Sequence, residues 1–540
     1  MSYISRGREI VDRLGVAARS IAVIRRSGLI SFSRPDQVVK SGKAIRALGP
    51  VAGAAYAAAQ RDDAALGLVD ERGELTFGEL DRRSNALARA FAEHGIAPGS
   101  VLGIMARDHR GVVETMLAAG KLGVHLVPMN AGFSGPQLRD IVIREDVGAI
   151  VHDEEFTDAV AELPDGVRRF LAWTDSPHQD SLEQLIADSD QRPLPAPVRH
   201  GGLIILTSGT QGTPKGAPRK IGNPLAVAQL LDRIPLRAGE STVLGAPLYH
   251  GTGLSQLIMS FALGSACVLS RRFDPLATLR SVERYRAGAL VIVPTMLRRL
   301  VDLPPHVLVG FDTSSLRIVL VAGSALPPDL GNRAMVAFGD VIHNMYGSTE
   351  HSIVTVATPE DWKAAPGTVG RPPIGTRVVL LDEADRPIVE PGVTGRIFAG
   401  SDLVFDGYTD GGRKETIDGV VACGDLGHFD ADGRLFIDGR EDDMIVSGGE
   451  NVYPVEVENL IHQFPGVHDA AVIGVPDEEF GQRLLAYVVP EIGVRLDTEV
   501  IREYVRSNLA RYKVPREIVL IDEIPVSSTG KPLKRVLAGS

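Results

Sequence analysis

The chain has 540 residues and a formal net charge of −11, with 44% apolar and 23% charged residues. This length predicts three to four domain-sized units around a large core, and the composition is that of an ordinary globular protein. Cys267 and Cys423 lie too far apart in sequence to suggest a disulfide scaffold or a cysteine metal site, which fits a reducing compartment. No apolar run reaches the roughly 18 residues of a membrane span, and the acidic balance disfavours nucleic acid as a partner.

The first 50 residues are basic, with ten arginines and lysines against three acidic residues. Within them, segment 8–30 mixes apolar residues with Arg13, Arg19, Arg25 and Arg26. Three hypotheses stay open: an amphipathic helix on an anionic membrane, an organellar transit peptide, and a basic helix packed on the main domain. Together with the cysteine pattern and the lack of an apolar membrane span, these observations lead us to expect a cytoplasmic protein. Peripheral membrane contact through segment 8–30 is the alternative.

Strand-like and helix-like segments alternate from about residue 60 to 340. The apolar runs at 101–105, 124–129 and 149–151 predict strands, and 111–122 predicts a helix. Such alternation is typical of an α/β fold in which helices cover both faces of parallel sheets. Ligands of such folds bind beyond the carboxyl ends of the strands.

The pattern changes near residue 366, where short alternating runs are separated by Pro-Gly, Thr-Gly and Asp-Gly turns. We predict a basic N-terminal extension (1–50), a large domain (51–438) and a small α+β C-terminal domain (439–540). The β-rich subdomain, at about 366–437, belongs to the large domain.

A predicted buried strand at 203–206 leads into a segment rich in glycine and hydroxyl residues, 206–216. A strand followed by such a segment frees backbone N–H groups to cradle phosphates. The segment is not a Walker loop, because Gly216 rather than Ser or Thr follows Lys215. Taken alone, such a segment is more often a flexible surface loop. The whole string, however, resembles the phosphate-binding signature of the adenylate-forming enzymes, which implies that Thr207, Ser208, Gly209, Thr210, Gln211, Gly212 and Lys215 bind ATP.

Four further motifs follow in order: Tyr346-Gly347-Ser348-Thr349-Glu350, Cys423-Gly424-Asp425, the run from Gly439-Arg440 to Gly448-Gly449-Glu450, and Pro525 to Gly530-Lys531. Each alone has a plain structural interpretation, such as a helix start, a turn or a solvated lysine. Together with segment 206–216, they resemble the signature sequences of the adenylate-forming superfamily over about residues 60–535. Within it, the chain resembles the fatty acyl-CoA synthetases of bacterial type.

The resemblance implies a fold and a set of residue roles. It implies a large domain of stacked, parallel-rich sheets with a β-barrel-like subdomain, and a small mobile C-terminal domain. The implied catalytic residues are Lys531, Thr349, Glu350 (which also holds Mg²⁺) and His250. The implied ATP and AMP contacts, besides segment 206–216, are Gly323, Ser324, Ala325, Tyr346, Gly347, Ser348, Asp425 and Arg440. Asp442 would be the hinge, and Ser447, Gly448 and Gly449 would line the CoA tunnel.

The resemblance also implies a reaction with two half-reactions. A carboxylate attacks the α-phosphorus of ATP to give an acyl-adenylate and pyrophosphate, and a thiol then displaces AMP. The protein would supply positioning and charge neutralisation by Mg²⁺, Lys531 and the loop amides.

The segment 246–253 resembles the family stretch that borders the acyl pocket, with His250 at the pocket. Residues 251–260 contain no acidic side chain that could pair with a substrate ammonium, which disfavours amino acids. The small residues Gly251, Gly253, Ala322 and Gly323 and the apolar residues Leu254, Leu257, Val293 and Met345 are the expected pocket walls. A fatty acid is the first expectation, and an aryl or branched acid is the second.

The intact Gly448-Gly449 segment favours CoA as the thiol acceptor, and an acyl-carrier protein stays an alternative. Gln211 and segment 217–220 depart from the commoner family pattern without affecting the prediction of ATP binding. Two other classes stay open: an adenylate-forming fold that binds its ligands without turnover, and oxidation of the adenylate as in luciferases.

Overall fold

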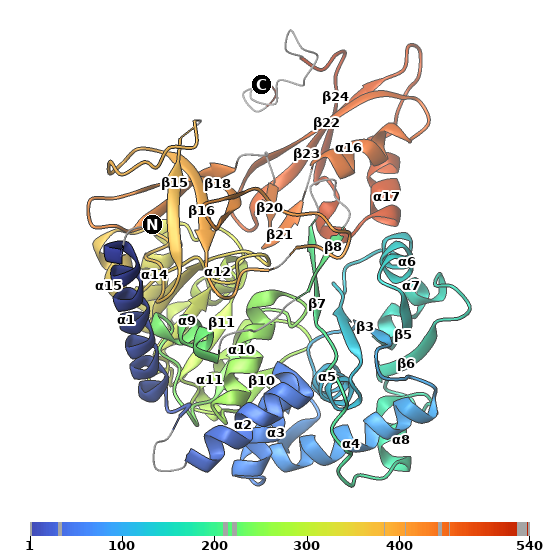
Figure 1. Ribbon diagram of the computed structural model, residues 1–540. Coiled ribbons are helices and arrows are strands. Elements are labelled where there is room, and N and C mark those ends of the chain that lie inside the picture. The colour runs from blue at the N-terminus through green and yellow to red at the C-terminus, as the bar shows by residue number, and fades with distance from the viewer. Residues whose placement is uncertain are drawn as a thin grey trace.

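The computed structural model describes residues 3–30, 35–208, 214–218, 224–382, 384–405, 407–440, 445–452, 454–525 and 537. Figure 1 shows a large body, blue to yellow, with a smaller C-terminal domain, orange to red, above it. Within the described part of the chain, no helix has the length and apolar character needed to cross a bilayer.

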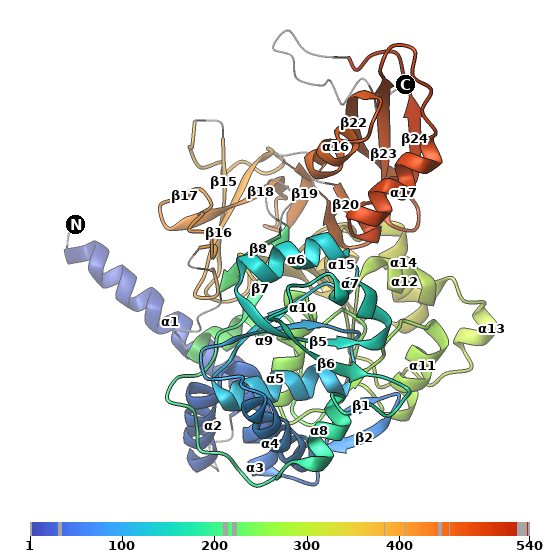
Figure 2. The ribbon, with the colours of Figure 1, turned by 90° about the vertical axis from the view of Figure 1, so that its right-hand side faces the viewer.

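The N-terminal segment forms α1 (Tyr3–Ser27) and α2 (Pro35–Leu48), and α3 (Pro50–Arg61) follows. The last turns of α1 pack beside α9 (Val227–Asp232), where Val23 and Ile24 are buried. Gly53 of α3 allows α2 to approach, because a Cβ there would lie 2.5 Å from the Ile45 Cα atom. Figure 2 shows the first half of α1 projecting away from the body. Of the three hypotheses for the N-terminal segment, packing of a basic helix on the main domain therefore applies to the last turns of α1.

A four-stranded parallel sheet has the order β4-β3-β5-β6. Its strands are β3 (Val101–Met105), β4 (His125–Pro128), β5 (Val147–Asp153) and β6 (Arg168–Trp173). The accompanying helices are α4 (Phe77–Glu93), α5 (Arg110–Leu122), α6 (Gly135–Arg144), α7 (Thr157–Ala161) and α8 (Leu182–Asp188). Thr76 caps α4 in a reciprocal pair with Glu79, as its position before the apolar pattern predicts.

The second sheet has eight strands in the order β14-β13-β12-β11-β9-β10-β1-β2, and only its two edge pairings are antiparallel. The strands are β1 (Leu66–Asp70), β2 (Gly73–Thr76), β9 (Thr242–Leu244), β10 (Cys267–Leu269), β11 (Ala289–Ile292), β12 (Ile318–Val321), β13 (Ile342–Tyr346) and β14 (Thr355–Ala357). Its helices are α10 (Gly251–Ala262), α11 (Pro275–Arg284), α12 (Pro294–Val301), α13 (Pro305–Leu308), α14 (Pro328–Phe338) and α15 (Pro359–Ala364). The predicted α/β fold with parallel-rich sheets is confirmed.

Two smaller sheets complete the large body. Strands β7 (Ile204–Ser208) and β8 (Pro214–Pro218) pair antiparallel, with Thr207 opposite Lys215. The β-rich segment forms a five-stranded antiparallel sheet from β15 (Arg377–Leu381), β16 (Gly395–Gly400), β17 (Thr416–Ile417), β18 (Val420–Phe429) and β19 (Leu435–Arg440). Strand β19 continues to Arg440, two residues beyond the predicted domain boundary.

Within its described residues, the C-terminal domain is a five-stranded sheet with two helices. Its strands are β20 (Ile445–Ser447), β21 (Glu450–Val452), β22 (Val467–Asp477), β23 (Gly481–Pro490) and β24 (Glu517–Leu520), and its helices are α16 (Pro454–His462) and α17 (Thr498–Asn508). The β20–β21 hairpin of this domain faces the large body (Figure 1).

Short 3-10 turns lie at Glu154–Phe156 and Pro224–Ala226 in the large body and at Arg511–Lys513 in the C-terminal domain.

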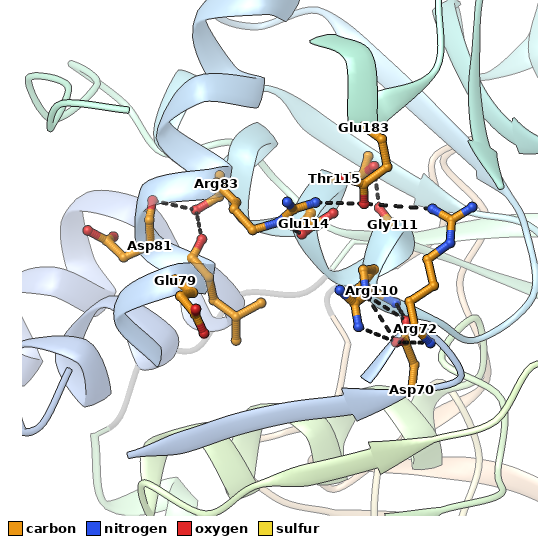
Figure 3. Close-up of polar contacts among 12 residues, drawn as sticks. Asp70, Arg72, Glu79, Asp81, Arg83, Arg110, Gly111, Glu114, Thr115 and Glu183 are labelled. Atoms are coloured by element: carbon orange, nitrogen blue, oxygen red, sulfur yellow. Dashed lines mark hydrogen bonds and ion pairs between the residues drawn. The ribbon is translucent and has the colours of Figure 1, made fainter. Parts of the chain in front are cut away.

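Ion pairs join the helices of the first sheet to one another and to β1 of the second sheet (Figure 3). Arg83 of α4 donates to Glu114 of α5 at 2.5 Å and to Glu183 of α8 at 2.7 Å. Arg110 at the start of α5 makes a bidentate contact with Asp70 at the end of β1, with a shortest distance of 2.6 Å. Removing Arg83 or Arg110 would leave the buried carboxylate of Glu114 or Asp70 without its partner, which typically costs about 3–5 kcal/mol.

Candidate active site

A cavity of about 2290 Å³ lies where the C-terminal domain meets the carboxyl ends of the eight-stranded sheet. Residues predicted from different parts of the sequence meet on its wall: His250, Gly323, Ser324, Ala325, Tyr346, Gly347, Ser348, Thr349, Glu350, Asp425, Gly448 and Gly449. The position beyond the strand ends is where parallel α/β sheets bind ligands.

At one end of this cavity, the Tyr346 hydroxyl donates to the Asp425 carboxylate at 2.6 Å. Tyr346 ends β13 of the large sheet, whereas Asp425 lies on β18 of the β-rich sheet. Burial, together with the charge of Asp425, raises the pKa of Tyr346 well above its ordinary value, so its hydroxyl keeps its proton. Arg440 lies directly opposite Asp425 on the paired strand β19. An aromatic ring, a carboxylate and a strand carrying an arginine therefore converge here.

The Glu350 carboxylate accepts hydrogen bonds from the Ser348 hydroxyl at 2.8 Å and the Tyr408 hydroxyl at 2.7 Å. Burial alone would raise the pKa of Glu350, but the charge of Lys414 and these hydrogen bonds outweigh burial and lower the pKa to about 2. The carboxylate is therefore ionised across the neutral range. Thr349, beside it, also lines the cavity.

Glu350 fits a magnesium ion as a buried, ionised oxygen ligand. The described residues contain no group of three or more His, Cys, Asp or Glu side chains that could hold a metal by themselves. A cation at Glu350 would therefore take its other ligands from substrate phosphates and water, which is how Mg²⁺ commonly binds with nucleotides.

The tip of the β20–β21 hairpin consists of two glycines, and both line the cavity. Gly448 and Gly449 have φ values of +62° and +85°, which side chains rarely adopt. A Cβ on Gly323, which follows β12, would lie 4.0 Å from the Gly449 Cα atom, and a Cβ on Gly449 would lie 3.6 Å from Val293. The hairpin tip therefore lies against the loop after β12, within van der Waals contact distance of Gly323 and Val293.

His250 contacts the same hairpin. Its Nε2 atom lies 3.0 Å from the Glu450 Oε1 atom, and the Tyr249 hydroxyl donates to that oxygen at 3.3 Å. Burial lowers the pKa of His250, but the charges of Glu450 and Asp108 outweigh it, so the pKa is raised overall. The pKa of Glu450 is lowered, because the charge of His250 outweighs the effect of burial. The result is a charge-assisted contact between the two domains.

Several predicted residues lie away from this wall. Lys215 is not among the lining residues, and its Nζ atom pairs with Asp410 at 3.0 Å. Ser447 is buried behind the hairpin tip. Gly253 and Leu257 are not pocket walls: a Cβ on Gly253 would collide with the Pro247 carbonyl, and Leu257 faces the core. Leu254, Val293, Met345, Gly251 and Ala322 do line the cavity.

Other predicted residues fall where the structure gives no description. Gly209, Thr210, Gln211, Gly212, Asp442 and Lys531 lie outside the described residues. Thr207, Ser208 and Arg440 have a described backbone only. The roles of these residues stay predictions.

Sequence reasoning assigned no role to Glu450, Tyr408, Lys414 or Asp108. Glu450 directly follows the glycine pair. Its position in the sequence could have predicted a role at the site, because a carboxylate next to the hairpin tip is placed wherever the tip is placed. Tyr408 and Lys414 carried no signal, since they reach Glu350 only through the fold of the β-rich subdomain. Asp108 accepts the Leu248 N–H at 3.1 Å and thereby supports the loop before His250.

Comparison with known families settles the class. The family model for AMP-binding enzymes matches residues 54–409, and that for the AMP-binding enzyme C-terminal domain matches 456–531. The chain belongs to the AMP-binding enzyme family. It is an AMP-forming acid–thiol ligase, as predicted.

Two curated relatives and one solved structure describe this likeness. A feruloyl-CoA synthase from Amycolatopsis sp. is 34% identical over 468 residues, which cover 85% of this chain and 92% of the relative. An indoleacetate–CoA ligase from Aromatoleum aromaticum is 32% identical over 483 residues, with the same coverage of 85% and 92%. The o-succinylbenzoate CoA synthetase from Bacillus subtilis, bound with a product analogue, aligns with a TM-score of 0.79 at 25% identity, covering 90% of this chain and 98% of that one.

The same Bacillus subtilis enzyme in complex with AMP aligns with a TM-score of only 0.65, covering 90% of this chain and 97% of that one. Since the enzyme is the same apart from two substitutions in the product-analogue structure, the difference reflects how its parts are arranged. The present arrangement resembles the product-analogue complex more than the AMP complex.

Proposed function

We propose that the chain couples an apolar carboxylic acid to CoA through an acyl-adenylate, with ATP converted to AMP and pyrophosphate. The single observation that carries this proposal is the glycine hairpin at Gly448–Gly449 seated against Gly323 in the cavity that also holds Tyr346, Glu350 and Asp425. Nucleotide-binding residues and a backbone surface narrow enough for a thiol arm thus share one site.

In the first half-reaction, an oxygen of the acid attacks the α-phosphorus, and the bond from that phosphorus to the pyrophosphate oxygen breaks. Asp425 and Tyr346 fit the ribose and adenine, and Glu350 fits a Mg²⁺ ion, which when bound would neutralise phosphate charge. Lys531, a compact point charge, would stabilise the charge developing on phosphorus.

In the second half-reaction, the CoA sulfur attacks the acyl carbon, the bond to the AMP oxygen breaks, and the thiol proton leaves to water. The hairpin against Gly323 and the His250–Glu450 contact support this step, because they keep the hairpin at the reacting end of the cavity. The likeness to a product-analogue complex supports the same assignment. CoA is therefore favoured over an acyl-carrier protein as the acceptor.

The acid class rests on two observations that point in different directions. The named relatives act on ferulate and indoleacetate, which favours an aryl acid. The apolar residues Leu254, Met345 and Val293 line the cavity, and the cavity continues beyond them along α10, which favours a fatty acid. Both classes agree with the lack of an acidic side chain at 251–260.

The test is an end-point assay of the purified full chain with ATP, Mg²⁺ and a panel of acids, with and without CoA. The panel contains ferulate, indoleacetate and saturated fatty acids, and mass spectrometry counts AMP, acyl-adenylate and thioester. We expect thioester and AMP in equal amounts only when CoA is present, and we expect Lys531→Ala to abolish adenylate formation while the protein still binds ATP. Adenylate that persists in the presence of CoA would overturn the assignment of the acceptor. Failure of every acid to release AMP would overturn the proposed function as a whole.

A further inference from the structure

The cavity does not end at the adenylate site. It continues along α10, which it follows from Gly251 at the first turn to Ala262 at the last. The lining residues Gly251, Ser255, Ile258 and Ala262 are spaced by three or four positions, so they form one stripe on one face of the helix. A helix of 12 residues is about 18 Å long, which gives the length of this wall.

The N-terminal extension supplies a further part of the wall, beside α3, which packs on α10. Ile24 of α1, Leu29 and Ile30 just after it, and Val38 and Ile45 of α2 line the same cavity. Leu225, Val227 and Leu230, at and around α9, complete this wall. Figure 1 shows α10 between the β20–β21 hairpin above and α2 and α3 below. The family model begins at residue 54, so α1 and α2 precede the part of the chain that it matches.

The side chains that line this part of the cavity favour an alkyl chain as the ligand. Ile258 and Ala262 of the stripe and the lining residues of α1 and α2 named above are aliphatic. Ser255 on the stripe and the charged side chains Arg46, Arg61 and Asp62 around α2 and α3 also line the cavity. Ile45 and Gly42 at the α2 end are exposed, so the channel reaches solvent there. An alkyl chain gains roughly fourfold in binding for each methylene that such a wall removes from water.

Length decides between the two acid classes. One leaflet of a bilayer core is about 15 Å thick, so a path of about 18 Å matches the acyl chains of membrane lipids. An aryl acid would fill only the part of the cavity beside the first turns of α10. We propose that α1 and α2 form the distal wall of the acyl site and that the substrate is a long-chain fatty acid whose tail lies along α10. This inference rests on the proposed function and names its acid.

The test places a phenylalanine at successive depths of the channel. Ser255→Phe, Ala262→Phe and Gly42→Phe move outward from the reacting end, with Ser255 and Ala262 about two turns, or roughly 10 Å, apart. Gly42 suits this change, because a Cβ there meets nothing within 4 Å. Gly15→Phe is the matched control: Gly15 is also an exposed helical glycine with nothing within 4 Å, and it does not line the cavity.

The readout is kcat/KM for thioester formation with saturated acids from hexanoate to stearate. We expect Ser255→Phe to reject all but the shortest acids, Ala262→Phe to accept intermediate lengths, and Gly42→Phe to lose at least tenfold with the longest acids alone. Gly15→Phe should behave as the unsubstituted chain, and hexanoate turnover serves as the folding control for the two distal variants.

Equal losses for every chain length in the distal variants would overturn the inference. Turnover confined to ferulate or indoleacetate, and insensitive to Ala262→Phe and Gly42→Phe, would also overturn it while leaving the proposed CoA ligase intact. If no acid of either class releases AMP, the proposed function itself fails, so the two failures are distinguishable.

Discussion

His250 of the large domain and Glu450 of the C-terminal domain meet across the domain boundary, with 3.0 Å between Nε2 and Oε1. The two residues are 200 positions apart in sequence. His250 precedes the first turn of α10 and Glu450 begins β21, so the contact joins the acyl channel to the glycine hairpin. A change at either residue should therefore affect the step that needs the hairpin in place.

We expect Glu450→Gln to slow thioester formation by roughly two- to fivefold, the range for a partly exposed ion pair, and to leave adenylate formation unchanged. The pKa of His250 is raised by Glu450, so the contact is fully formed at pH below the ordinary histidine value and is lost as pH rises through the raised value. Stopped-flow assays that start from preformed acyl-adenylate would measure the thioester step across pH.

In this experiment the glutamine variant, which has no charge pair to lose, should show the reduced rate already at low pH and should approach the unsubstituted chain as pH rises. Tyr249→Phe is the matched control, because it removes a neutral donor to the same oxygen and leaves the charge pair in place. An equal loss in both half-reactions would contradict a role limited to the hairpin.

Gly449→Ala should impair the thioester step more strongly. The residue has a φ of +85°, where a side chain costs roughly 1–2 kcal/mol, and the added Cβ would lie 3.6 Å from Val293. Gly493→Ala is the matched control in the same domain, with a φ of +80° and nothing within 4 Å of the added carbon. Both variants should lose similar thermal stability, but only Gly449→Ala should accumulate adenylate when CoA is present. Normal thioester yield from Gly449→Ala would place the thiol path elsewhere.

Local patterns predicted most of the elements around the site. The apolar run at 101–105 is β3, and the run at 111–122 is α5 within one residue. These features depend on neighbours a few residues away, so the sequence contains their causes. The glycine pair at 448–449 was predicted to line the CoA tunnel from its resemblance to the family motif, and its positive φ values are a finding of the structure.

Contacts between distant segments were not predictable. Glu450 reaches His250, Tyr408 reaches Glu350, and α2 reaches the channel beside α10 only after several sheets have assembled. Lys215 illustrates the converse: its motif predicts a phosphate contact, whereas the fold places Asp410 within 3.0 Å of its ammonium. Such pairings depend on which opposite charges the fold places close together, because the attraction between two charges falls with the distance between them.

Glu350→Gln should reduce adenylate formation by about 10²–10³-fold, the typical loss when one group that stabilises transition-state charge is removed. The two hydroxyls donate to different oxygens of Glu350, so the amide oxygen can keep only one of these hydrogen bonds. Because the lowered pKa of Glu350 contributes stability above the ordinary glutamate value, we expect a lower Tm for the variant near neutral pH, and the difference should shrink as pH falls through the lowered value. A steep rise in the Mg²⁺ concentration needed for half-maximal rate would identify the lost ligand. Glu415→Gln, on the same subdomain but paired with Arg396 at the surface, should leave the Mg²⁺ dependence unchanged.

Asp108→Asn should stabilise the protein at alkaline pH. Burial raises the pKa of Asp108 to about 7, although its hydrogen bond from Leu248 and nearby positive charges oppose this effect. Because the folded state holds this proton more tightly than the unfolded state, the favourable contribution is complete below the ordinary aspartate pKa and is lost as pH rises towards 7. The shift corresponds to at most about 4 kcal/mol, and partial exposure of the side chain reduces the expected gain to about 2 kcal/mol.

Asparagine can accept the same Leu248 N–H bond without titrating, so the comparison isolates the charge. Calorimetric Tm values of the two proteins should agree within about 1 °C at pH 4 and diverge by several degrees at pH 8, with the asparagine variant higher. Asp153→Asn is the contrasting variant, because Asp153 is paired with His109 at 2.8 Å and its loss should destabilise the protein at pH 8. A gain for Asp108→Asn that is equal at both pH values would show that its carboxyl is already ionised at pH 4 in the folded chain.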